Sequence, residues 1–140
     1  MKALLLAAGL GTRLRPLTER VPKCLVPVRG KPLLGYWLDL LVSNGIDHIL
    51  INTHHLPDAV RSFIAVSKWQ NVVTLVHEEE LLGTGGTVLK NRALFSDSSF
   101  LLAHADNLTR FDVNAFVAKH ASRPAGVDIT CLLYTSDAAD

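Results

Sequence analysis

Residues 2–18 read KALLLAAGLGTRLRPLT, an apolar run followed by a basic segment that contains glycines. The run from Lys2 to Ala7 is short and apolar after its first residue, a pattern typical of a parallel strand buried on both faces. Residues 8–31 are rich in glycine, proline and basic side chains, so they predict a long loop. Loops of this length in a compact domain usually carry function. We therefore expect a ligand site directly after the first strand.

The rest of the chain alternates between helix and strand patterns. Residues 32–44 have apolar side chains at helical spacing, with Pro32 at the start and Gly45 after the end. The same reasoning predicts helices over 57–66, 87–95 and 113–120, and strands over 46–52, 71–77, 100–104 and from about Val127 onward. This alternation predicts an α/β fold, a three-layer α/β/α, Rossmann-like and mostly parallel sheet that is truncated.

Three segments with polar or glycine-rich character follow predicted strands. They are the first loop, a second glycine-rich loop over residues 78–86, and Asp106 just after the fourth strand. Ligands of parallel α/β sheets bind beyond the carboxyl ends of the strands. We therefore expect the three segments to line one cleft.

Composition and length exclude several classes of protein. A chain of 140 residues with 49% apolar and 19% charged residues predicts one globular domain and excludes a disordered or fibrous protein. No apolar run reaches the roughly 18 residues that span a bilayer. Arg13 and Arg15 follow the N-terminal apolar run where a signal peptide would have its cleavage site, so we expect a cytoplasmic protein without membrane association. Cys24 and Cys131 form neither a disulfide framework nor a metal cluster.

The net charge of +1 hides an uneven distribution of basic residues. Half of the 14 lysines and arginines lie in the first 31 positions, against the single acid Glu19. This distribution favours a site for an anion such as a phosphate chain, with a solvated basic loop as the alternative. Few aromatic residues interleave these charges, which argues against a nucleic-acid groove. The seven basic residues are Lys2, Arg13, Arg15, Arg20, Lys23, Arg29 and Lys31.

The first loop differs from the two common phosphate-binding motifs. It lacks the Gly-Lys-Ser/Thr of a Walker A loop, and Leu14 stands where a dinucleotide fingerprint has its third glycine. Its longer form, Gly-x-Gly-Thr-Arg-Leu-x-Pro-Leu-Thr followed by Pro-Lys, resembles the signature of the sugar-1-phosphate nucleotidylyltransferases. Residues 23–34 continue the likeness, residues 82–86 (LGTGG) resemble the family's base-binding loop, and Asp106-Asn107 resembles its metal site. The resemblance spans residues 2 to about 130.

The resemblance implies an enzyme that joins a nucleoside triphosphate (NTP) to a sugar 1-phosphate and releases pyrophosphate. Arg13 matches the arginine that binds the departing pyrophosphate, and Lys23 matches the lysine at the reacting phosphates. Asp106 matches one of two ligands for Mg²⁺. The remaining matched positions would bind the nucleotide, through backbone N–H groups in the first loop and through base contacts in the second: Ala8, Gly9, Leu10, Gly11, Thr12, Glu78, Gly83 and Thr84.

The chemistry of nucleotidyl transfer fits these residue types independently of the resemblance. The reaction needs in-line positioning and neutralisation of phosphate charge rather than a protein nucleophile. Mg²⁺ often takes only one or two carboxylates, with phosphate and water completing its coordination. An arginine, a lysine and a carboxylate at a strand end therefore form an economical set for this reaction, and no protein nucleophile is required.

Other interpretations of these residues remain open. The whole chain could be a catalytically silent, nucleotide-binding regulatory relative, although Arg13, Lys23 and Asp106 are all present. It could also be a cytidylyl- or molybdopterin-type transferase of the same fold. The LGTGG loop favours a guanylyl- and mannose-1-phosphate-type enzyme over a thymidylyl type.

Three histidines, His54, His55 and His104, fit no zinc-binding pattern, so we expect them to be strand-end or core residues. We expect Cys24 in the core.

The last ten residues, CLLYTSDAAD, differ in character from the rest of the chain. They resemble the in-frame translation of a sequencing adapter, so we expect residues 1–130 to be the nucleotide-binding half of the domain and 131–140 to be a non-native tail. The alternative is a native strand continuing from Val127. On the first interpretation the sugar pocket and the second metal ligand lie beyond this chain. The chain alone should then be inactive, and the full-length protein could be a homo-oligomer.

Overall fold

The computed structural model of the protein describes residues 1–96 and 98–132. The chain forms two compact units, Met1–Leu108 and Thr109–Asp140. The first unit contains a four-stranded sheet of β1 (Lys2–Leu6), β4 (His48–Thr53), β5 (Val73–His77) and β6 (Phe100–His104). Every pairing in this sheet is parallel, which confirms the predicted parallel α/β architecture.

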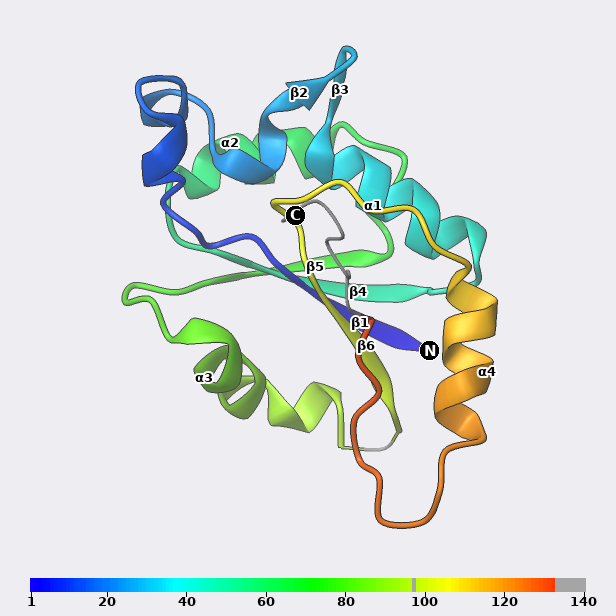
Figure 1. The fold of residues 1–140 in the computed structure, drawn as a ribbon. Helices are drawn as coiled ribbons and strands as arrows, with labels where there is room; N and C mark the ends of the chain where they lie inside the picture. The colour runs from blue at the N-terminus through cyan, green and yellow to red at the C-terminus, as the bar shows by residue number, and fades with distance from the viewer. Residues whose placement is uncertain (97, 133–140) are drawn as a thin grey trace, which may run out of the picture. The chain divides into compact units, whose positions relative to one another are not determined.

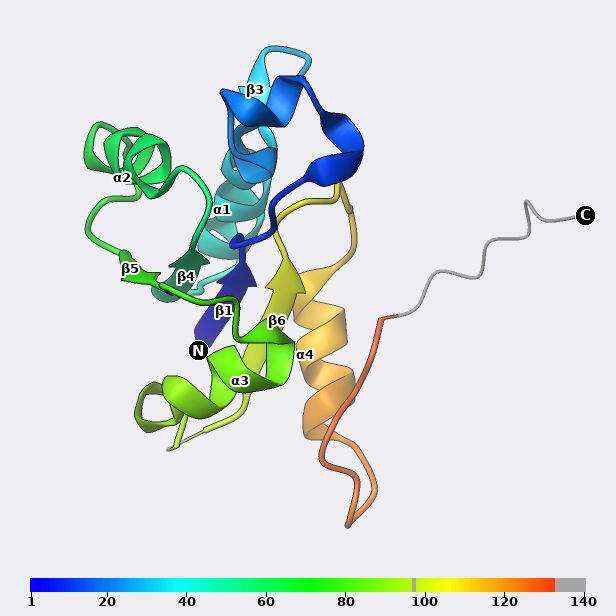
Figure 2. The ribbon, with the colours of Figure 1, turned by 90° about the vertical axis from the view of Figure 1, so that its left-hand side faces the viewer.

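Helices cover both faces of this sheet, as Figures 1 and 2 show. One face carries α1 (Leu33–Ser43) and α2 (Pro57–Ala65), and the other carries α3 (Gly83–Lys90) with the short η4 (Arg92–Leu94). The predicted three layers are therefore present in this unit. The helix predicted over 32–44 is α1 and that over 57–66 is α2, with ends that differ by one residue.

Side chains that alternate along the strands fill a core on each face of the sheet. Leu4 and Leu6 of β1 and Leu50 of β4 form a cluster with Phe95, which stacks on Phe100 with ring centroids 4.2 Å apart. The intervening strand residues Ala3, Leu5, Ile49 and Ile51 are completely buried and point to the opposite face. Burial of both faces explains why the residues at the centre of β1 and β4 are apolar.

The order of the strands fixes where a ligand can bind. The sheet runs β5-β4-β1-β6, so the chain builds outward from β1 in one direction and then returns to add β6 on the other side. The crevice between the carboxyl ends of β1 and β6 lies at this reversal, where open α/β sheets bind ligands. The backbone N–H of Ala105 donates to the Leu6 carbonyl at 3.0 Å and extends the β1–β6 pairing to the edge of the crevice.

The segment predicted as a long loop contains short elements. These are the 3-10 turns η1 (Thr12–Leu14), η2 (Leu17–Glu19) and η3 (Lys23–Leu25), and a small hairpin of β2 (Pro27–Val28) and β3 (Lys31–Pro32). Local bonds close the turns, such as Leu14 N–H to the Gly11 carbonyl at 2.9 Å. The prolines at intervals through the segment prevent any of these turns from growing into a helix.

Two predicted boundaries around residues 78–95 are wrong. The second glycine-rich loop does not extend to Gly86, because α3 begins at Gly83 and the glycines form its first turn. The helix predicted over 87–95 therefore starts earlier and is broken at Asn91, whose side-chain amide donates to the Thr87 carbonyl at 2.9 Å. This bond satisfies a carbonyl at the end of α3, and η4 follows as a separate turn.

The second unit contains one predicted helix and lacks one predicted strand. The helix is α4 (Val113–Ala121), whose N-cap Asp112 accepts a hydrogen bond from Ala115 N–H at 2.9 Å. Residues 127–132 form no strand, so the strand predicted from Val127 is absent from the part of the chain that the structure describes. A local turn takes its place, since Arg123 Nε donates to the Val127 carbonyl at 2.6 Å. Most of the predicted tail, residues 133–140, lies outside the described residues.

Within the described residues, no helix is both long and apolar enough to cross a membrane. Both cysteines are free; Cys24 is buried and Cys131 is exposed.

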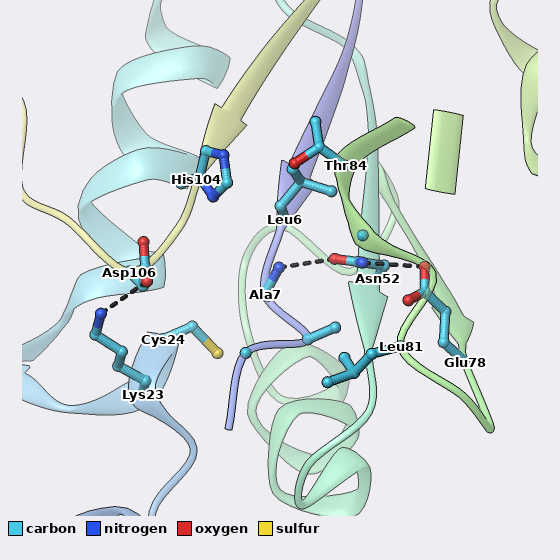
Figure 3. A pocket seen from close by; sticks show the side chains of 13 residues that line it. Leu6, Ala7, Lys23, Cys24, Asn52, Glu78, Leu81, Thr84, His104 and Asp106 are labelled. Carbon is cyan, nitrogen blue, oxygen red and sulfur yellow. Dashed lines mark hydrogen bonds and ion pairs between the residues drawn. The ribbon is translucent and has the colours of Figure 1, made fainter. Parts of the chain in front are cut away.

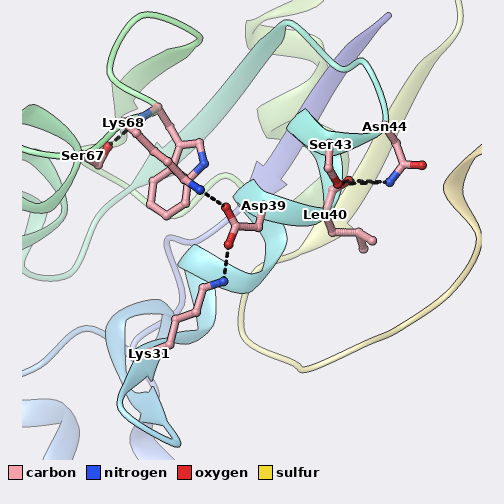
Figure 4. A network of polar contacts seen from close by, with 8 residues as sticks. Lys31, Asp39, Leu40, Ser43, Asn44, Ser67 and Lys68 are labelled. Atoms are coloured by element: carbon pink, nitrogen blue, oxygen red, sulfur yellow. Dashed lines mark hydrogen bonds and ion pairs between the residues drawn. The ribbon is translucent and has the colours of Figure 1, made fainter.

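A polar network joins the small hairpin to α1 (Figure 4). The Asp39 carboxylate of α1 pairs with Lys31 of β3, and also with Lys68 at 2.7 Å. Partial burial raises the pKa of Asp39, but hydrogen bonds and charge from the two lysines outweigh it and hold the pKa below the usual value. Lys31, one of the basic residues of the N-terminal segment, thus has a carboxylate partner in the fold.

Candidate functional site

A cavity of about 220 Å³ opens at the carboxyl ends of the parallel strands. It lies at the reversal of strand order, and segments far apart in the sequence contribute to its wall (Figure 3). The predicted convergence of the two glycine-containing segments and Asp106 is therefore observed. The lining residues are Leu6, Ala7, Ala8, Gly9, Lys23, Cys24, Asn52, Glu78, Leu81, Gly83, Thr84, His104 and Asp106.

Lys23 and Asp106 form an ion pair on one wall of this cavity. The Lys23 ammonium lies 2.7 Å from Asp106 Oδ2, although 83 residues separate the two in the sequence. η3 positions Lys23, and the connection after β6 positions Asp106. The two side chains are 30% and 36% exposed, so both can contact a ligand in the cavity. The pair therefore sets a cation and a carboxylate side by side in the cavity wall.

The opposite wall is held by a network of buried polar side chains. Asn52, near the end of β4, accepts a hydrogen bond from Ala7 N–H at 2.7 Å and donates to Glu78 Oε1 at 3.1 Å. The Thr87 hydroxyl donates to the same Glu78 oxygen at 2.6 Å. All three side chains are at most 3% exposed. The network therefore fixes the backbone at the end of β1, where the first loop begins, relative to α3.

The structure places the predicted nucleotide-binding residues in two groups. Ala8 and Gly9 line the cavity from the first loop, whereas Glu78 lines it from the second loop, and Gly83 and Thr84 line it from the first turn of α3. Leu10, Gly11 and Thr12 are not among the lining residues, and neither is Arg13, which is exposed in η1. Glu78 is buried within the network rather than solvated, in contrast to the exposed Glu79 and Glu80. The proposed roles of all these residues remain predictions.

The three histidines lie at or just after the ends of strands and Cys24 is buried, as expected, but His104 and Cys24 also line the cavity. His54 lies within hydrogen-bond distance of the Glu78 carbonyl, at 2.8 Å, and stacks on His77. Within the described residues, no three histidine, cysteine, aspartate or glutamate side chains are grouped closely enough to hold a metal ion. Burial raises the pKa of the Cys24 thiol to about 12, and the neighbouring negative charge of Asp106 adds to the effect. Cys24 is therefore a neutral thiol in the cavity wall.

Asn52 and Thr87 are site residues that the sequence analysis does not identify. A polar pair at the end of an apolar strand, Asn52-Thr53, is a usable signal because buried polar groups need partners. Thr87 offers no such signal, because a threonine in a predicted helix is ordinary and its partners come from distant segments.

The family model described as "Nucleotidyl transferase" matches residues 2–140. The chain belongs to the nucleotidyl transferase family.

Curated relatives share about a third of the aligned residues with the chain. A UTP–glucose-1-phosphate uridylyltransferase of Synechocystis is 34% identical over 89% of the chain and 35% of the relative. A mannose-1-phosphate guanylyltransferase catalytic subunit beta of Xenopus tropicalis is 34% identical over 86% of the chain and 34% of the relative. An N-acetylmuramate alpha-1-phosphate uridylyltransferase of Caulobacter vibrioides is 33% identical over 96% and 57%. The chain thus spans about a third of the first two relatives and 57% of the third.

Solved structures show the same architecture. HddC from Yersinia pseudotuberculosis, complexed with GMP-PN, matches with a TM-score of 0.73 and 28% identity over 86% of this chain and 54% of that one. The CTP:phosphocholine cytidylyltransferase LicC of Streptococcus pneumoniae matches with a TM-score of 0.62 and 36% identity over 75% and 44%. The fold of this chain is therefore shared with these two proteins.

Proposed function

We propose that the protein transfers a nucleotidyl group from an NTP to a sugar 1-phosphate. The observation that carries the proposal is the Lys23–Asp106 pair, which lies at the reversal of strand order beside the glycine loop. The named relatives, which act on glucose, mannose and N-acetylmuramate 1-phosphates, support the choice of acceptor. The product would be an NDP-sugar for glycoconjugate synthesis, made in the cytoplasm, where NTPs and sugar phosphates are available.

The reaction forms one phosphorus–oxygen bond and breaks another. A phosphate oxygen of the sugar 1-phosphate attacks the α-phosphorus of the NTP, and the bond from that phosphorus to the bridging oxygen of pyrophosphate breaks. Lys23 would neutralise the charge that shifts among the phosphates, an effect that a preformed cation provides without reorganisation. Arg13, carried on an exposed turn, would hold the departing pyrophosphate, and backbone N–H groups of residues 8–12 would hold the nucleotide.

Asp106 is the residue that would hold a divalent cation, which we propose to be Mg²⁺. Its carboxylate is part of the cavity wall, and its exposed fraction of 36% leaves it accessible to an ion that enters with the phosphates. This fits the preference of Mg²⁺ for one or two carboxylates completed by phosphate and water oxygens. When bound, Mg²⁺ would supply further charge neutralisation at the phosphates. Before substrate enters, Lys23 balances the charge of Asp106.

The test is pyrophosphate release by the protein expressed from its complete reading frame. The panel combines GTP, UTP, CTP and dTTP with glucose, mannose and N-acetylmuramate 1-phosphates, and includes phosphocholine because of the likeness to LicC. Magnesium-dependent release with one sugar 1-phosphate supports the proposal. Release with phosphocholine alone would indicate the cytidylyl alternative. Tight NTP binding without release for any pair would indicate a regulatory nucleotide-binding protein.

A further inference from the structure

Thr18 differs from its neighbours in the first loop by being buried. Residues 12–17, 19 and 20 are exposed, whereas Thr18 is 1% exposed. Its hydroxyl donates to the Gly11 carbonyl at 2.8 Å, and the same carbonyl accepts from Leu14 N–H at 2.9 Å. A side chain of η2 therefore closes the loop back onto the glycine that precedes η1.

Gly11 has a backbone conformation and close neighbours that no residue with a Cβ would fit. Its φ of +65° lies in the left-handed region, which favours glycine. A Cβ at this position would come within 2.8 Å of Thr18 Cγ2 and 3.2 Å of Lys23 Cβ. The backbone of Gly11 is thus packed between Thr18 and Lys23, and the position of the loop is coupled to that of the lysine in the cavity.

His55 connects this loop to the sheet. Its Nε2 lies 2.7 Å from the Thr18 carbonyl. A carbonyl only accepts hydrogen bonds, so Nε2 must carry a hydrogen and donate. His55 lies in the short connection between β4 and α2, two residues after the strand ends. Two hydrogen bonds therefore connect Gly11 to the segment after β4: one from the Thr18 hydroxyl to Gly11, and one from the His55 imidazole to Thr18.

We propose that Thr18 and His55 are positioning residues that hold the first loop in the conformation required to bind the triphosphate. The inference rests on the proposed function for the identity of the ligand. Neither side chain lines the cavity, so each would act through Gly11 and Lys23 rather than by touching the nucleotide. Without these bonds the loop, most of whose residues are exposed, would lose its buried anchor and would have to be ordered by the ligand at the cost of affinity.

The experiment uses the 140-residue chain with two pairs of matched variants. Thr18→Val removes the hydroxyl and keeps the shape, whereas Thr18→Ser keeps the hydroxyl. His55→Leu removes the donor, whereas His55→Gln retains an N–H donor on a side chain of similar reach. Calorimetry measures the affinity of each protein for GTP and UTP and, separately, for guanosine and uridine. Limited trypsin digestion measures cleavage after Arg13 and Arg20 in the loop, with cleavage after the exposed Arg61 of α2 as the reference.

We expect Thr18→Val and His55→Leu to weaken triphosphate binding about tenfold, as for one lost hydrogen bond, and to leave nucleoside binding unchanged. Cleavage after Arg13 and Arg20 should accelerate relative to Arg61. Thr18→Ser and His55→Gln should restore both properties. Equal losses for triphosphate and nucleoside, or unchanged cleavage and affinity in both deletion variants, would overturn the inference.

Thermal melting of each variant separates loop release from unfolding. If Thr18→Val has a clearly lower melting temperature than the unchanged chain, the test relies on His55→Leu and His55→Gln, because His55 is only half-buried. If neither the unchanged chain nor the full-length protein binds a triphosphate, the proposed function fails, whereas the cleavage rates still decide whether Thr18 and His55 hold the loop. The two failures are therefore distinguishable.

Discussion

Lys23 Nζ lies 2.7 Å from Asp106 Oδ2 across the carboxyl ends of β1 and β6. Neither residue belongs to a strand, and the parallel sheet brings them together because the chain reverses its direction of strand addition at β1. The pair is charge-balanced and partly exposed, which suits the triphosphate binding that we propose. Loss of either charge should therefore change how the cavity binds phosphates and their counterion.

Replacement of Asp106 by asparagine should change the metal dependence of the reaction as well as its rate. The asparagine side chain would keep an oxygen ligand but lose the charge that attracts a divalent cation. In the full-length protein, we expect the Mg²⁺ concentration for half-maximal pyrophosphate release to rise about tenfold or more. Lys90→Ala, which changes an exposed residue outside the cavity wall, is the control and should leave it unchanged. An unaltered Mg²⁺ requirement in Asp106→Asn would place the ion elsewhere.

Asn52→Leu should destabilise the fold by leaving three buried polar groups with fewer partners. Ala7 N–H loses its acceptor, and the Glu78 carboxyl group and Thr87 hydroxyl each lose a donor. Unsatisfied buried groups cost about 1–3 kcal/mol, so urea unfolding should show a loss of that size. The surface change Gln70→Leu should stay within about 0.5 kcal/mol. Equal stability of the two variants would mean that the network contributes nothing measurable.

The sequence predicts most of the elements but not the polar network that shapes the cavity. Apolar periodicity and the positions of Pro32 and Gly45 locate α1 closely because helix ends carry local signals. The start of α3 at Gly83 escapes prediction because glycine has low helix propensity, which the surrounding fold overrides here. The partners of Asn52 come from β1, the end of β5 and α3, so only the folded chain reveals them.

For the candidate site, too, the sequence predicts some features and only the folded chain reveals the others. The convergence of Lys23 and Asp106 follows from the rule for parallel sheets, whereas the burial of Thr18 and its bond to His55 have no sequence pattern. The apolar neighbourhood of Val127 favours a strand in the sequence. In the structure a turn replaces this strand, and Gly126 in the turn has a φ of +83°.

Cys24 should remain a protonated, unreactive thiol near neutral pH. Burial raises its pKa from 9.0 to about 12 in the folded state. The contribution of this thiol to stability is therefore fully present below pH 9 and is lost as the pH rises from 9 towards 12, where only the unfolded chain ionises. Iodoacetamide at about pH 8 should modify the exposed Cys131 and spare Cys24 until urea unfolds the chain. Mass spectrometry of the two peptides checks this, and equal labelling in the folded chain would contradict the burial.

Removal of residues 131–140 should leave the fold intact. We predict from the adapter-like sequence that this segment is not native, and Cys131 and Leu132 are exposed in the structure. The chain ending at residue 130 should match the 140-residue chain in thermal melting, within about 0.5 kcal/mol of stability. The sequence of the source gene provides the second check. An uninterrupted genomic reading frame that encodes the same ten residues would refute the prediction.

The central claim is that Lys23 and Asp106 act together on the reacting phosphates, and a double-mutant cycle of pyrophosphate release tests it most directly. The full-length protein is assayed with the substrate pair that the panel selects, as Lys23→Ala, Asp106→Ala, both together, and Lys90→Ala as the control. Each single change should slow release by about 10²–10³, as for one preorganised catalytic group. Because both groups serve one step, the double variant should lose far less than the product of the two effects. A loss in the double variant equal to the product of the two single losses, or release at the rate of the Lys90→Ala control, would contradict the account.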